Sequence, residues 1–307
     1  MAVYKKEHFD IARKIVSNMT TESWETIPHA VISYEADATE LLKEYKKLNE
    51  GCTDKSKKIS INTVVMKILC EGLLAAPKMN CTIEFNRKLV RGTLCYNDCV
   101  NVSLPAVLPD GKMMTVNLRN VDSKNLNEIT ELVNDTMRRM QNTDMTEAMF
   151  EVSLDNTLKG LKKGKIKQAI YRLVGSKTGK YKVRTLKGEA KKKYYSIPEK
   201  DRLTKKDIEQ GTVTISNLGS IHRNQKGMCY LLEIIPPQVT ALAVNAVQKK
   251  PVVVTDENGN DKIEIRSILP ITVAIDHRAL DYGDCLGFFK RLDEIFDNPS
   301  VIHDWKE

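Results

Sequence analysis

The sequence predicts a mixed α/β fold whose sheet is largely antiparallel or mixed, and three observations support this. Helical and strand periodicities alternate through the first half of the chain, strand patterns dominate after residue 210, and a capped amphipathic helix closes the chain. The chain has 307 residues, of which 41% are hydrophobic and 29% charged, enough to bury a sizeable core. This composition excludes disordered, collagen-like and small disulfide-stapled proteins.

The predicted helices carry apolar residues at helical spacing and recognisable starts. The first covers residues 8–19, and Asp37 opens a capping-box pattern before the second. Ser60 is the expected N-cap of the third, and a long amphipathic helix follows Ser123. Asp281 takes the N-cap position of the last helix. The expected buried stripe of that helix is Leu286, Phe289, Leu292, Ile295 and Phe296.

The predicted strands alternate apolar and polar residues between turn signals. Asn86 and Arg87 mark a turn between two short strands, Asp110-Gly111 marks the next turn, and residues 256–260 mark the turn of a late hairpin. The expected strands are 27–37, 83–85, 89–90, 99–108, 113–118, 211–219, 239–247 and the two arms of 251–275.

The positive charge is concentrated in one segment. Residues 159–206 hold eighteen Lys or Arg and three acidic residues, a net charge of +15; because the whole chain carries +8, the remainder carries −7. Apolar residues spaced through the start of this segment predict a short amphipathic helix followed by a solvated loop. A solvated insertion, a contact with an acidic partner and a contact with an anionic membrane surface all remain open. Nucleic acid is not expected, because the tyrosines of the segment match no aromatic RNA-binding signature.

The cysteines and the N-terminus point to a reducing compartment. Seven cysteines are an odd number, and they form no C-x-x-C motif and no zinc site with nearby histidines. Charged residues occupy the place where a secretory signal would be apolar, and no apolar run is long enough to span a membrane. We therefore expect reduced thiols, no metal and a cytoplasmic location.

His277 is the candidate catalytic residue, because it lies where a predicted strand stops and the capped last helix begins. A His-x-x-x-Asp pattern alone is weak evidence, because it is more often a surface histidine followed by a helix cap, here at Asp281. If the carboxylate holds an arginine or the imidazole, a neutral ring nitrogen is left free to take a proton from a thiol.

Ser216 lies at the end of a second predicted strand, in the run Thr214 to Gly219. Ser216 and Asn217 would either satisfy backbone groups at the strand end or supply a hydroxyl that donates to a developing oxyanion.

Seven motifs resemble, in order and approximate spacing, the catalytic domain of the 2-oxo acid dehydrogenase acyltransferases, the dihydrolipoyl acyltransferases. The chain also resembles the related chloramphenicol acetyltransferases. The resemblance covers about residues 8–142 and 210–303. The motifs are ARKIVSNMTTESWETIPHAVISYEADATELL, KISINTVVMKIL, PKMN, PDG, GTVTISNLG, IPPQVTALAV and ITVAIDHRALD.

The resemblance implies a two-layer mixed-sheet acyltransferase that forms trimers, with the active site in a channel between subunits. Coenzyme A would enter one end and the acyl acceptor the other. His277 would be the general base that deprotonates a thiol of coenzyme A or of a dihydrolipoyl group. Ser216 would donate to the oxyanion, and Asp281 would pair with Arg13 to shape the loop around His277.

The resemblance also implies a single catalytic domain over residues 1–307, with a basic insertion at about 143–210. No lipoyl domain and no peripheral-subunit-binding domain is expected, so a separate lipoylated or acyl-carrier protein would deliver the acyl group. Tyr282 stands where the family has glycine, which would reshape the acceptor pocket, and Lys112 to Thr115 replace the family residues after Asp110-Gly111.

The motifs indicate the residues that would bind coenzyme A less clearly than they indicate the catalytic residues. Lys249 and Lys250 would either meet its phosphates or lie solvated before the hairpin. Two other functions remain: a small-molecule O- or N-acetyltransferase of the chloramphenicol type, and a non-catalytic trimeric scaffold in which His277 and Ser216 are relics. His29 is expected to be structural.

Overall fold

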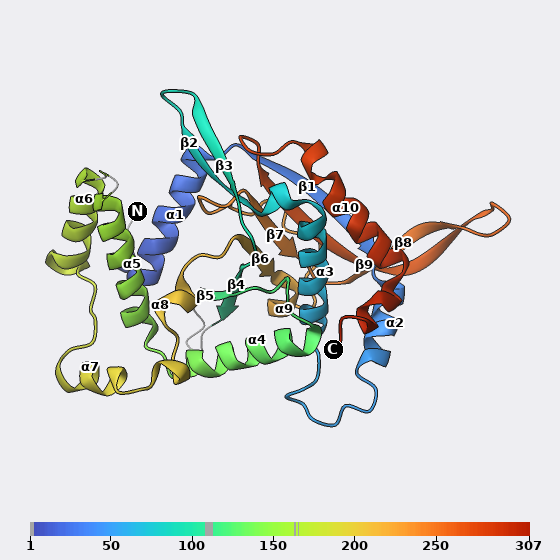
Figure 1. The fold of residues 1–307 in the computed structure, drawn as a ribbon, viewed down its shortest axis with the longest axis horizontal. Coiled ribbons are helices and arrows are strands. Elements are labelled where there is room, and N and C mark those ends of the chain that lie inside the picture. Colours follow the sequence, from blue (N-terminus) through green and yellow to red (C-terminus); the bar gives the residue numbers. More distant parts are fainter. Residues whose placement is uncertain (1–2, 108–112, 163, 165) are drawn as a thin grey trace.

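A mixed seven-stranded sheet forms the centre of the molecule (Figure 1). The computed structural model describes residues 3–107, 113–162, 164 and 166–307. The predicted turn at Asp110-Gly111 and the departure at Lys112 lie outside the described residues. The strands run in the order β1 (His29–Asp37), β9 (Asp261–Asp276), β7 (Thr240–Val244), β6 (Val213–Asn217), β4 (Val102–Val107) and β5 (Met113–Leu118), and β8 (Gln248–Thr255) pairs with β9.

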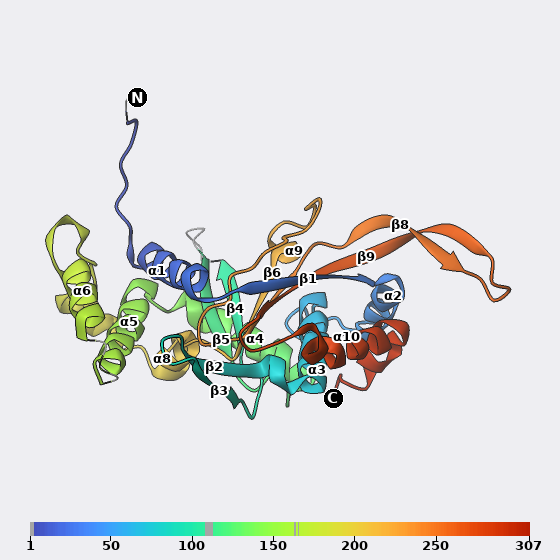
Figure 2. The ribbon, with the colours of Figure 1, turned by 90° about the horizontal axis from the view of Figure 1, so that it is seen from above.

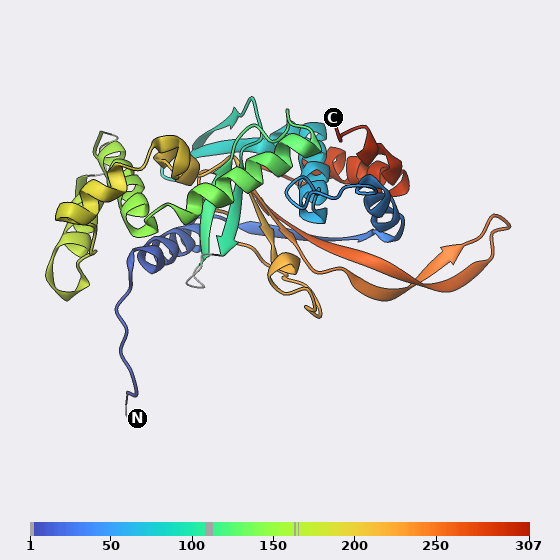
Figure 3. The same cartoon turned by 90° about the horizontal axis from the view of Figure 1, so that it is seen from below.

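The directions of the strands confirm the predicted mixed sheet. β6 runs parallel to both of its neighbours, β4 and β7, and the other pairs are antiparallel. All five residues of β7 are buried, as expected for a strand covered on both faces. β8 and the start of β9 form a hairpin that projects from the body, at the opposite end from α5 and α6 (Figure 3).

A separate two-stranded ribbon is formed by β2 (Cys81–Asn86) and β3 (Arg91–Tyr96). The predicted second strand at 89–90 was wrong, because these residues form the turn. Val90 has a φ of 49°, a left-handed conformation that interrupts an extended strand.

Helices cover one face of the sheet (Figure 2). Four helices pack against the sheet and against each other. They are α3 (Ile61–Ala75), α10 (Tyr282–Asp297), α2 (Thr39–Leu48) and α4 (Leu126–Gln141). Ser60 caps α3 as predicted, since its hydroxyl accepts from the Thr63 backbone N–H at 3.0 Å. The N-cap of α2 is Ala38 rather than Asp37.

The last helix confirms Asp281 as N-cap and most of its predicted stripe. Phe289, Leu292, Ile295 and Phe296 are buried, whereas Leu286 is exposed. The first helix, α1 (Ile11–Thr26), extends about two turns beyond the predicted end.

The opposite face of the sheet is covered by the segment 222–238 and the end of α1. Ile234 packs with Ile27, Ala241 and Ala274. The Thr272 hydroxyl of β9 donates to the Cys229 carbonyl. The sheet is thus enclosed on both sides near its centre.

The basic segment is folded into helices against the body rather than forming a solvated loop. It contains the end of α5 (Met145–Lys162), α6 (Ile166–Lys177), α7 (Gly188–Tyr195) and α8 (Lys205–Ile208). Lys191 lies 3.0 Å from buried Glu147, and Lys205 lies 2.6 Å from Asp155. The predicted amphipathic helix is α6. Among the described residues, no helix has the length and apolar character needed to cross a bilayer.

Candidate active site

His277 lies immediately after β9, in the loop that leads to α10. Its backbone N–H donates to the Pro28 carbonyl at 3.0 Å, which ties this loop to the start of β1. The imidazole is 54% exposed. A fixed backbone with an open side chain suits a group that must meet a substrate.

The hydrogen bonds of the imidazole define which ring nitrogen is free. Nδ1 of His277 lies 3.0 Å from the Leu280 carbonyl oxygen and 3.4 Å from Oδ1 of Asp281. Both of these oxygens accept, so Nδ1 carries the proton and donates. In the neutral ring Nε2 then keeps its lone pair, which is the arrangement that a general base requires.

Asp276 and Arg278, the residues on either side of His277, form an ion pair that shapes the loop. The sequence motifs did not predict this pair. Arg278 Nε donates to Oδ1 of Asp276 at 2.9 Å, and its Nη2 donates to Oδ2 at 2.6 Å. The Arg278 backbone N–H also donates to Oδ1 at 2.9 Å, and the guanidinium lies over the Phe85 ring. Asp276 is fully buried. An acid and an arginine two positions apart at a strand end are the signal that could have found the pair.

We expect Arg278→Ala to lower the free energy of unfolding by about 3–5 kcal/mol, because a buried carboxylate would lose its cation. Urea denaturation measures this. Lys43→Ala breaks an exposed pair with Glu40 and should cost less than about 1 kcal/mol. Equal losses in the two variants would contradict a special role for the buried pair.

The predicted pair between Asp281 and Arg13 is absent, and that prediction was wrong for the single chain. Arg13 is exposed in the first turn of α1 and makes no ion pair with the described residues. Thirteen helical residues, about 20 Å, separate it from Thr26 at the end of α1 that adjoins His277. Asp281 instead contacts the imidazole itself.

Ser216 occupies the centre of the sheet on the face away from the helices. It is buried, and its hydroxyl makes no hydrogen bond with the described residues. Across the ladder its neighbour is Ala243, which in turn faces Thr272. The side chain of Ala243 offers the hydroxyl no hydrogen-bonding group, so the hydroxyl is left to donate to an added group.

Asn217, the next residue, has the backbone role that was one of the two alternatives for this strand end. Its Oδ1 accepts from the Ser220 N–H at 2.8 Å, and its Nδ2 donates to Oδ1 of Asn62 at 2.9 Å. A Cβ at Gly219 would lie 2.8 Å from the Ala246 backbone, so the turn requires glycine. The turn thus fixes the strand end while Ser216 stays free.

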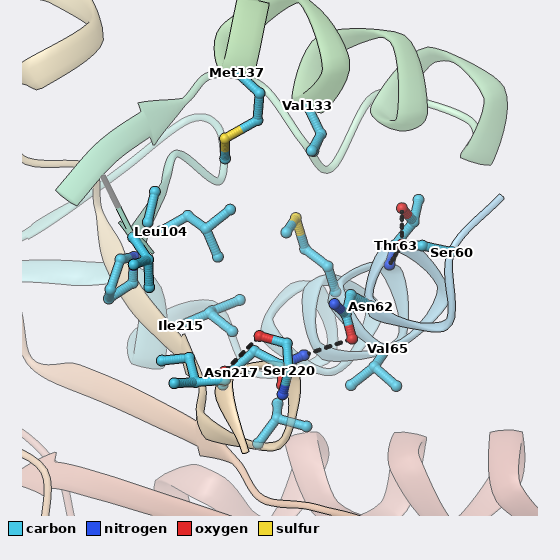
Figure 4. A pocket seen from close by; sticks show the side chains of 16 residues that line it. Ser60, Asn62, Thr63, Val65, Leu104, Val133, Met137, Ile215, Asn217 and Ser220 are labelled. Carbon is cyan, nitrogen blue, oxygen red and sulfur yellow. Dashed lines mark hydrogen bonds between the residues drawn. The ribbon is translucent and has the colours of Figure 1, made fainter. Parts of the chain in front are cut away.

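A cavity of about 280 Å³ lies on the helix side of the same strand end (Figure 4). Ile215 and Asn217 of β6 line it together with Leu104 of β4 and Met137 of α4. Side chains alternate along a strand, so Ser216 faces the other way. The cavity and the free hydroxyl therefore belong to opposite faces of the sheet.

Within one chain, His277 and Ser216 are far apart. Ser216 is in register with Ala243 and Thr272, and His277 follows Thr272 by five residues. This separation amounts to about 17 Å along the strands and about 10 Å across two of them. A single copy therefore cannot bring the two groups to one reacting carbonyl.

The remaining predicted residues make no hydrogen bond or ion pair with the His277 side chain in the described structure. Lys250 contacts Glu35, whereas Lys249 is exposed on the projecting hairpin and makes no ion pair with the described residues. The Tyr282 ring stacks on Phe289 at the surface, 6.0 Å between centroids, rather than entering the sheet end. That Tyr282 reshapes an acceptor pocket between subunits stays a prediction. His29 is structural as predicted, since its Nε2 accepts from the Ile234 N–H.

Cys285, close to His277 in α10, is not a second nucleophile. It is fully buried, and burial raises the pKa of its thiol to about 11. The pKa of the neighbouring Asp284 is held below its usual range by the Asp281 backbone N–H and then by Lys78. The first turn of α10 thus holds a neutral thiol and a charged, capped carboxylate.

The family model of the 2-oxoacid dehydrogenases acyltransferase (catalytic domain) matches residues 3–153 and 182–303. The chain belongs to this family. The match of this acyltransferase domain is interrupted over 154–181, a shorter stretch than the insertion predicted at about 143–210.

Named relatives share the domain. The dihydrolipoyllysine-residue acetyltransferase component of the pyruvate dehydrogenase complex of Rickettsia bellii is 25% identical over 292 residues, which are 94% of this chain and 52% of that protein. This acyltransferase domain therefore spans about half the length of the curated relatives it matches.

Solved structures share its fold. The cubic core of the pyruvate dehydrogenase multienzyme complex has a TM-score of 0.65 and 18% identity, covering 98% of this chain and 94% of that one. Azotobacter vinelandii dihydrolipoamide acetyltransferase gives the same values, and a serine, a histidine and an asparagine were investigated for their role in its catalytic mechanism. The predicted two-layer fold of the acyltransferase domain is confirmed.

Proposed function

We propose that this chain transfers a short acyl group between coenzyme A and a thiol such as a dihydrolipoyl group, with His277 as general base. The observation that carries the proposal is the hydrogen bond from Nδ1 to the Leu280 carbonyl, which leaves Nε2 as the free base. The names of the relatives, acetyltransferases that act on dihydrolipoyl residues, support this acceptor and the acetyl group.

The reaction requires one base and one donor. Nε2 of His277 takes the thiol proton, and the sulfur attacks the thioester carbonyl to give a tetrahedral oxyanion. The Ser216 hydroxyl of a neighbouring copy donates to that oxygen. The intermediate then expels the other sulfur as a thiolate, which takes the proton back from the imidazolium.

A homotrimer, or a multiple of trimers, is the proposed assembly. Support comes from the separation of His277 and Ser216 within one chain, and from the apolar face that Ile263 and Ile265 expose on the projecting hairpin. The solved structure with the same fold that forms the cubic core of the pyruvate dehydrogenase multienzyme complex also supports a larger assembly. We further propose a cytoplasmic location, supported by seven free cysteines, and delivery of the acyl group by a lipoylated or acyl-carrier protein.

The test is an acyl-transfer assay with acetyl-CoA against dihydrolipoamide and a panel of hydroxyl and amine acceptors. We expect dihydrolipoamide to react with the highest kcat/KM. Transfer confined to hydroxyl or amine acceptors would replace the thiol reaction with the chloramphenicol type, and no transfer to any acceptor would favour the scaffold.

A further inference from the structure

The stretch that the family match leaves out, residues 154–181, includes a helix with an uncovered apolar face. α6 packs on α5 through Ala169, which is buried. Ile166, Ile170 and Val174 form a row four residues apart and are 58%, 51% and 53% exposed. Residues at this spacing lie on one side of a helix. The row therefore faces outward, away from α5.

The same stretch and the residues that follow it carry cations that make no ion pair within the described part of the chain. Residues 156–188 contain eleven Lys or Arg and no acidic residue. Among residues 156–188, Lys159 is paired with Asp155. The cations that make no ion pair with described residues are Lys162, Lys167, Arg172, Lys177, Lys180, Lys182, Arg184 and Lys187.

Two of these cations share the side of α6 that carries the apolar row. Lys167 and Lys177 lie within α6, on the same side as the row when residues are placed at 100° intervals. Tyr171, 74% exposed, lies at the edge of that side. α5 and α6 stand at the far end of the molecule from the β8–β9 hairpin, so the body does not cover them (Figures 1 and 3).

We propose that α6 and its flanking lysines bind an anionic phospholipid surface, with Ile166, Ile170 and Val174 entering the boundary between headgroups and acyl chains. An interfacial helix combines an apolar side with basic residues, and anionic headgroups attract clustered Lys and Arg. A bilayer supplies both partners at once: negative charge for the lysines and an apolar layer for the row. An acidic protein surface would meet the lysines and leave the row in water. The proposal does not rest on the acyl-transfer reaction.

The test is flotation of the full chain with phosphatidylcholine vesicles that contain about 30% phosphatidylserine, and with phosphatidylcholine vesicles alone. We expect binding to the anionic vesicles only. The triple variant Ile166→Ser, Ile170→Ser, Val174→Ser should reduce the bound fraction at least about tenfold. Leu89→Ser, a matched exposed apolar residue on the β2–β3 turn, should leave binding unchanged.

A second variant tests the charge. Lys167→Gln with Lys177→Gln should also weaken binding, whereas Lys43→Gln with Lys47→Gln, two paired lysines on α2, should not. Circular dichroism and the acyl-transfer rate in solution report whether each variant is folded. Absence of binding by the parent chain overturns the proposal, as does full binding by the triple serine variant. Binding to polyglutamate but not to vesicles would overturn it in favour of an acidic protein.

Discussion

His277→Ala should slow acyl transfer by about 10²- to 10⁴-fold, because the thiol would lose the base that takes its proton. Nε2 is the only ring nitrogen left free once Nδ1 donates to the Leu280 carbonyl. The loss should appear in kcat, since the imidazole acts on the reacting proton rather than on the distant parts of the substrate. Steady-state rates with acetyl-CoA and dihydrolipoamide measure it.

The control for this variant is His303→Ala. His303 contacts Glu44 at 2.9 Å, far along the chain from the loop around His277, and its loss should leave the rate near that of the parent. A His277→Ala protein that is folded and as fast as the parent would remove the base from the mechanism and favour the scaffold.

A mixture of two inactive variants should regain activity. Ser216→Ala alone should cost about 10²- to 10³-fold, the loss typical of an oxyanion donor. Since one copy cannot bring Ser216 to its own His277, each site would combine the histidine of one copy with the serine of the next. Every trimer that contains both His277→Ala and Ser216→Ala chains would therefore have one of its three sites intact.

Co-expression of the two variants with different affinity tags, followed by purification through both, isolates the mixed assemblies. Each variant carried through the same steps by itself gives the background. If the mixed assemblies are no faster than that background, the two residues do not meet across copies. Recovery to about one third of the parent rate supports the shared site.

Local patterns predicted the parts of the fold that depend on neighbouring residues. The Ser60 cap and the strand at His29–Asp37 involve residues a few positions apart. Helix and strand periodicity is local information, so these features could be predicted.

Features that depend on tertiary placement could not be predicted in the same way. The pairing of Arg13 with Asp281 required knowing which end of α1 adjoins β9, and the chain places Arg13 at the other end. The separation of Ser216 from His277 follows from strand directions, which alternation along a strand does not reveal. Leu286 had the right helical position but no neighbour in the single chain to cover it.

The length of α1 has a consequence for how substrates approach. Near its start, Lys14 donates to the Gly175 carbonyl at the end of α6, and past its other end the Pro28 carbonyl accepts from His277. Its 16 residues form a helix about 24 Å long, which separates these two contacts. A lipid surface bound by α6 would thus lie well away from the imidazole of His277. A carrier protein could then approach His277 from the solvent side.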